Sequence, residues 1–150
     1  MKVHVSAWSE FDRLRDQQKG IFGCSSAEWE AAYYALEKLL REEFGPQASP
    51  LGGPIGWHLG SDWCEQRTLG VVLDEWSFVT EGLLQRLHAW LCGLPGTWIL
   101  SVCAGGYKVD DLFHFMILRS GVYAAHMKYS KSRAVGVLRE KVNLSLTLAV

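Results

Sequence analysis

The chain has 150 residues, of which 49% are hydrophobic and 21% are charged, and its fifteen basic side chains nearly balance sixteen acidic ones. This composition is typical of one globular domain and excludes disordered, collagen-like and coiled-coil chains. The net charge of -1 argues against a nucleic-acid binder, which needs a basic surface to neutralise phosphates.

The amino-terminal third of the chain predicts one strand and two helices. Residues 2–7 alternate in polarity like a strand, and a short helix is expected over 8–18. A capping box, Ser25 followed by Glu28, opens a helix over 25–45. Apolar side chains recur along it at helical spacing and Gly45 with Pro46 stops it, so we expect an amphipathic helix lying on a core.

The middle of the chain predicts two strands and a second long helix. Residues 46–56 concentrate proline and glycine and are expected to form a surface loop. Strands are expected at 55–59 and 67–73. Thr80 can cap a helix whose apolar positions between 83 and 94 follow the helical period, and Pro95 with Gly96 ends it.

The carboxyl-terminal third is rich in strand signals. The apolar run 97–104 has the length of a buried strand, and 112–127 predicts a β-hairpin that turns at Ser120–Gly121. The alternating run 142–148 favours an edge strand, whereas 134–142 is also compatible with a short helix.

With the short helix over 8–18 left out, these elements give the order β-α-β-β-α-β-β-β-β. Strands joined by short turns must pair antiparallel. We therefore expect residues 1–150 to form a single α+β domain, with a mainly antiparallel sheet and two main helices packed on one face.

Candidate catalytic and metal-binding groups do not converge in the sequence. The four cysteines are scattered without a CxxC pair, which disfavours structural zinc. Cys64 lies near His58, but its acidic neighbours would raise the pKa of the thiol. His88 and Cys92 share a helix face but make only two ligands, so a boundary histidine with one bonded nitrogen is favoured. We predict no catalytic residue, no metal site and no cofactor.

The predicted hairpin contains two histidines, one on each strand. His114 and His126 are expected to face each other as cross-strand neighbours, in a structural arrangement more readily than as a ligand set.

The seven tryptophans exceed what one core requires. Three of them, Trp29, Trp90 and Trp98, fall on predicted core faces. Three others have polar or acidic neighbours, and aromatic anchors rimmed by charge are typical of protein-binding surfaces. We predict a partner-binding surface made of Trp57, Asp62, Trp63, Glu65, Asp74, Glu75 and Trp76. Packing of these tryptophans beside ordinary surface acids remains the alternative.

The segment "GWHLGSDWCEQRTLGVVLDEWSFVTEGLLQRLHAWLCGLPGTWILSV" resembles the immunity proteins of bacterial polymorphic-toxin and contact-dependent growth-inhibition systems. The resemblance lies in a strand that ends near an aromatic, a helix of the "LLxxLxxWL" type, then "PxxW" and another strand. It covers about half of the chain and includes no invariant motif. It implies a small α+β inhibitor that binds the toxic domain of a cognate effector, often a nuclease.

We therefore expect a cytoplasmic, non-enzymatic protein, a monomer or homodimer, that neutralises a cognate toxin domain by stoichiometric occlusion. The amino end lacks the pattern of a secretory signal, and no run is long enough for a membrane helix. One alternative is a small-ligand module with an open sheet face lined by Phe113, Phe115 and Tyr123. Another is a cysteine-dependent hydrolase that uses Cys64 with His58 or His126.

Overall fold

The computed structural model of the chain describes residues 2–18, 26–50, 54–58, 67–105, 112–141 and 147–149. The helices are α1 Trp8–Gln18, α2 Ser26–Phe44, α3 Glu81–Cys92 and α4 Lys131–Lys141, with the short 3-10 turns η1 Gly45–Gln47 and η2 Trp76–Phe78. The strands are β1 Lys2–Val5, β2 Ala48–Ser49, β3 Ile55–His58, β4 Thr68–Leu73, β5 Ile99–Ala104, β6 Phe113–Leu118, β7 Gly121–Ala125 and β8 Thr147–Ala149.

The described strands form one mixed sheet in the order β2-β3-β4-β5-β6-β7-β1-β8. The fold is α+β as predicted, but the expectation of a mainly antiparallel sheet is wrong. Four of the neighbouring pairs are parallel, and β3–β4, β5–β6 and β6–β7 are antiparallel. The helix between β4 and β5 provides a crossover, which makes those strands parallel, and β1 inserts beside β7 and β8.

Most predicted elements are present with boundaries close to those expected. The helix predicted over 25–45 is α2, and the strands predicted at 55–59 and 67–73 are β3 and β4. The hairpin is confirmed, because β6 and β7 pair antiparallel and Leu118 is the register partner of Gly121. The short helix predicted over 8–18 is α1.

One expected loop contains a strand, and one ambiguous segment is resolved. The loop predicted over 46–56 contains β2, which pairs in parallel with β3. Within the ambiguous run 134–142, residues 134–141 are helical and belong to α4. An edge strand follows it, but the described part, β8, covers only the end of the predicted run, and residues 142–146 lie outside the described residues.

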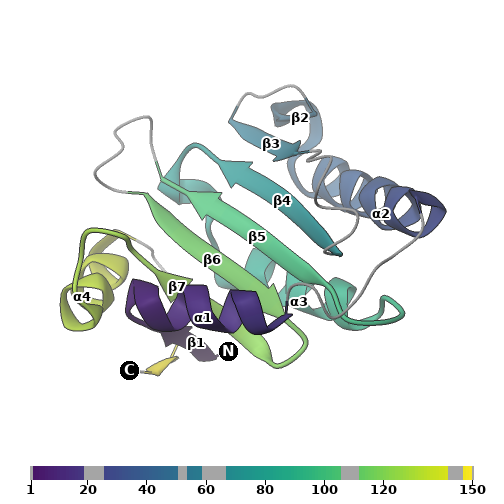
Figure 1. The fold of residues 1–150 in the computed structure, drawn as a ribbon. Coiled ribbons are helices and arrows are strands. Elements are labelled where there is room, and N and C mark those ends of the chain that lie inside the picture. Colours follow the sequence, from purple (N-terminus) through teal and green to yellow (C-terminus); the bar gives the residue numbers. More distant parts are fainter. Residues whose placement is uncertain are drawn as a thin grey trace.

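The two faces of the sheet carry two separate apolar clusters. Alternate residues of β6, Phe113, Phe115 and Ile117, belong to the large cluster, together with buried residues of α2, α3 and α4. The intervening residues Met116 and Leu118 belong to a smaller cluster with Phe11 of α1. Because successive strand residues point to opposite faces, α1 packs on the face opposite to the other helices. Figure 1 shows α1 in front of the sheet, with α2 and α4 at opposite ends.

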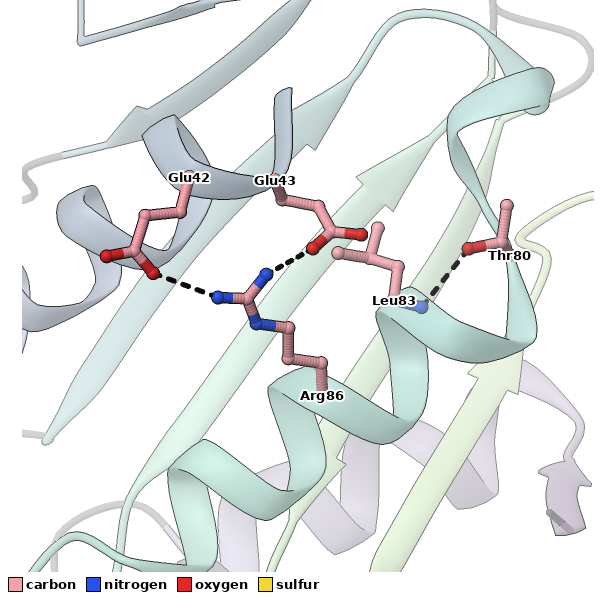
Figure 2. A network of polar contacts seen from close by, with 5 residues as sticks. All are labelled: Glu42, Glu43, Thr80, Leu83 and Arg86. Carbon is pink, nitrogen blue, oxygen red and sulfur yellow. Dashed lines mark hydrogen bonds and ion pairs between the residues drawn. The ribbon is translucent and has the colours of Figure 1, made fainter. Parts of the chain in front are cut away.

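Helix α3 begins at a side-chain cap and is joined to α2 by charge. The Thr80 hydroxyl accepts a hydrogen bond from the Leu83 N–H at 3.1 Å, so the predicted cap is confirmed. One turn later Arg86 bridges Glu42, at 3.0 Å, and Glu43 of α2 (Figure 2). A single guanidinium therefore holds the end of α2 against α3.

Removal of the cap tests how far α3 depends on it. Thr80→Ala is expected to lower the free energy of unfolding by about 1 kcal/mol, because the Leu83 N–H loses its acceptor. Thr80→Ser keeps the hydroxyl and serves as the matched control in urea denaturation. An alanine variant as stable as the serine variant would show that the cap contributes nothing.

Candidate functional site

Trp57 does not lie on the surface. Its side chain is only 1% exposed, and its indole N–H donates a 2.6 Å hydrogen bond to the hydroxyl of Tyr33 on α2. The Arg41 guanidinium lies 5.3 Å from the ring centroid. The prediction that Trp57 is an exposed partner contact is therefore wrong. β3 turns Trp57 toward α2, and polar neighbours in sequence do not reveal which face a strand residue occupies.

Three predicted contacts cannot be placed. Asp62, Trp63 and Glu65 lie outside the described residues, as does Cys64. Their role remains a prediction from sequence.

Asp74, Glu75 and Trp76 follow β4 directly. The Asp74 N–H donates to the Pro54 carbonyl at 2.8 Å, which ties this corner to the start of β3. Asp74 is half-buried and Glu75 is exposed. Trp76 is half-buried and meets Phe113 edge-on, at 5.4 Å between centroids. Its indole nitrogen is buried, and no described residue gives it a hydrogen-bond partner. Trp76 thus packs partly into the core, and Glu75 is the exposed acid of this corner.

The other tryptophans expected in packing positions are found there. Trp29 and Trp98 are buried, and Trp90 is partly buried against the large cluster. The Trp29 indole donates to the Thr68 carbonyl at 3.2 Å, which joins α2 to the start of β4. These contacts confirm the packing assignment for all three.

The near-neutral composition conceals a separation of charge. Helix α2 carries five carboxylates and two basic side chains. The described residues between 26 and 98 carry eight carboxylates and four basic side chains, which is a net charge of -4. Residues 128–141, which include α4, carry five basic side chains and one carboxylate. Because α2 contacts β2 and α4 contacts β1, the two charges occupy opposite ends of the sheet (Figure 1).

We call the α2 side the acidic end and the α4 side the basic end. The acidic end comprises the solvent-facing side chains of α2 together with Asp74 and Glu75. Phe44, the last residue of α2, lies 5.7 Å from Phe78 of η2 between ring centroids, so the corner after β4 adjoins the end of α2. The basic end comprises the solvent-facing side chains of residues 128–141.

A thiol–imidazole pair was not anticipated from the sequence. Cys103 of β5 and His114 of β6 are register partners, and the sulfur lies 3.3 Å from His114 Nδ1. Trp8 of α1 meets the imidazole edge-on at 5.0 Å. Burial raises the pKa of the Cys103 thiol. Burial first, then the charges of Arg15 and His126, lower the pKa of His114. Both groups are therefore neutral near pH 7, which makes the thiol a poor nucleophile.

The expected pairing of His114 with His126 is wrong. His114 is opposite Ala125 in the hairpin register. The buried His126 ring instead stacks on Tyr129 at 3.9 Å and meets Phe113 at 4.8 Å, and its Nδ1 accepts from the Lys128 N–H. The one-residue difference in register moves His126 to the opposite face of the sheet from His114.

The His88 prediction is confirmed. His88 Nε2 lies 3.1 Å from the Arg119 carbonyl oxygen and 3.6 Å from the Cys92 sulfur. Among the residues that the structure describes, no three or more histidine, cysteine or acidic side chains are grouped so as to hold a metal ion.

The structure bears on the two alternative sites, the aromatic ligand site and the Cys64 site, to different extents. Phe113 and Phe115 are buried in the large cluster, whereas Tyr123 packs with the small cluster on the other face. They do not line one open face, so that ligand site is ruled out. Cys64 and the His58 side chain fall outside what the structure describes, while His126 is buried against Phe113 and Tyr129.

No protein family, curated protein or solved structure matches the chain. In the described ranges, no helix has both the length and the apolar character required to cross a bilayer.

The Trp57–Tyr33 contact can be tested by what it contributes to the stability of the protein. Trp57→Phe keeps most of the packing but leaves the Tyr33 hydroxyl without its donor, so a loss of roughly 1–2 kcal/mol is expected. Trp57→Ala should cost roughly 3–5 kcal/mol because it opens a cavity. In a double-mutant cycle, Tyr33→Phe should add little to Trp57→Phe. If these variants had the same urea midpoints as the wild type, the buried position of Trp57 would be contradicted.

The lowered pKa of His114 predicts a loss of stability in acid. Below the usual imidazole pKa of about 6.5, the unfolded chain binds a proton that folded His114 does not yet accept. The free energy of unfolding should therefore fall as the pH drops through this value toward the folded pKa. His114→Phe should lose less stability between about pH 7 and about pH 5. Equal losses in both proteins, measured by urea denaturation, would contradict the assignment.

Proposed function

We propose that the protein is an immunity protein that binds a cognate toxin domain, such as a nuclease, and occludes it stoichiometrically. The observation that supports this proposal most is the separation of charge between the acidic and basic ends. A nuclease domain carries a basic groove that attracts phosphates. A basic partner is steered toward the acidic end and repelled by the basic end, so the encounter is oriented before contact.

Fewer contact residues are proposed from the described part of the chain than were predicted from the sequence. Asp74 and Glu75 remain as surface acids, with Trp76 as a partly buried support, and Trp57 is excluded by its burial. Asp62, Trp63 and Glu65 stay in the proposal as residues to be tested. The protein acts in this proposal without catalysis, as a cytoplasmic monomer or homodimer.

Cys103 and His114 are both neutral near pH 7. This argues against nucleophilic chemistry at this pair and agrees with a role in binding. A catalytic thiol requires a depressed pKa or an electropositive setting. Burial instead raises the pKa of the Cys103 thiol.

Co-expression with the toxin domain from a neighbouring gene tests the function directly. The wild-type protein should restore growth and form a one-to-one complex that survives size-exclusion chromatography. Asp74→Lys combined with Glu75→Lys should slow association by about tenfold or more at low salt, because steering is reversed. Glu140→Lys at the basic end is the matched control and should not slow association. A toxin that stays lethal and unbound in the presence of the wild-type protein would refute the proposal.

A further inference from the structure

Tyr34 is an unusual side chain for the surface of this helix. It is 61% exposed, whereas the adjacent Tyr33 lies on the buried face of α2. Among the large hydrophobic side chains that the structure describes, Tyr34 and Met127 are the two that are well exposed. Tyr34 lies at the acidic end, and Met127 lies beside the basic end.

Helix α2 is fixed to the rest of the protein along its whole length. Near its amino end Glu28 pairs with Arg67 at 3.0 Å. At its middle Tyr33 accepts the hydrogen bond from Trp57. At its carboxyl end Glu42 and Glu43 hold Arg86 (Figure 2). A side chain that faces outward from α2 is therefore displayed on a rigid element, which reduces the ordering cost of binding.

Charged side chains of both signs lie next to Tyr34, on a helix that carries five carboxylates and two basic side chains. Glu30 lies four residues before it and Glu37 three residues after it, so both are its neighbours on the helix surface. Lys38 lies four residues after it, and Glu37 is paired with Arg41 at 3.2 Å. Glu30 is exposed and adds negative charge beside the ring. Tyrosine is among the residues enriched at binding hot spots, and its ring face attracts arginine and lysine.

We propose that the outward face of α2, centred on Tyr34 and bordered by Glu30 and Glu37, is the docking surface for the basic toxin domain. This inference rests on the proposed function and names its interface. An arginine or lysine from the partner's basic groove lies over the Tyr34 ring, and Glu30 pairs with a neighbouring cation. The surface adjoins Asp74 and Glu75 through the end of α2, so both sets of acids contribute to one encounter.

A pair of equally exposed apolar residues supplies the test. Tyr34→Ala is expected to weaken binding of the purified toxin domain by about tenfold or more. Met127→Ala removes a side chain that is 66% exposed but lies beside the basic end, and should leave the affinity within about twofold. Both sites are exposed, so circular dichroism and urea midpoints should match the wild type. Affinity is measured by biolayer interferometry.

The outcomes separate the interface from the function. If the wild-type protein binds the toxin domain and Tyr34→Ala binds as tightly, the interface is overturned and the proposed function stands. If the wild-type protein does not bind, the function fails, and octa-arginine then probes the surface alone. Amide shift changes centred on α2 in a nuclear magnetic resonance titration, reduced by Tyr34→Ala, would support the surface. Changes elsewhere, or unaltered by that substitution, would overturn it.

Discussion

The hydrogen bond from the Trp57 indole to the Tyr33 hydroxyl joins the longest helix to the sheet, and much of the molecule depends on it. Both partners are buried, so breaking the bond leaves a polar group without water or a protein partner. The Arg41 guanidinium over the same indole and the Trp29 bond to Thr68 extend the contact along α2. Buried aromatic side chains, and not surface charge alone, therefore hold α2 against the sheet.

A net charge of -1 gives no indication of how charge is distributed. Segregation of acids onto α2 and bases onto residues 128–141 creates a field that a charged partner meets before any contact forms. Salt should weaken this steering, because exposed charges are screened beyond about 10 Å at 0.1 M salt. Ion pairs within α2 mainly fix side-chain positions, since exposed pairs add little to stability.

The elements could be predicted from the sequence because their signals are local. The Thr80 cap, the apolar period of α2 and the β6–β7 turn each lie within a short segment. Pairing between strands far apart in the sequence could not be predicted, because the insertion of β1 between β7 and β8 depends on residues more than a hundred positions apart. The same limit hid the Cys103–His114 pair, which exists only in the β5–β6 register.

The sequence did not reveal which of the aromatic side chains near acids face solvent. An aromatic side chain with acidic neighbours does occur, but Trp57 is turned into the core by strand alternation, whereas Tyr34 faces outward on a helix. Tyr33 lies on the buried face of α2, and the next residue points away from that face because each helical residue is rotated relative to the one before it. The most direct test of the account is a structure of the complex with the toxin domain. The account predicts Tyr34 and Glu30 buried at the interface, whereas a partner seated on α4 with α2 left in solvent would contradict it.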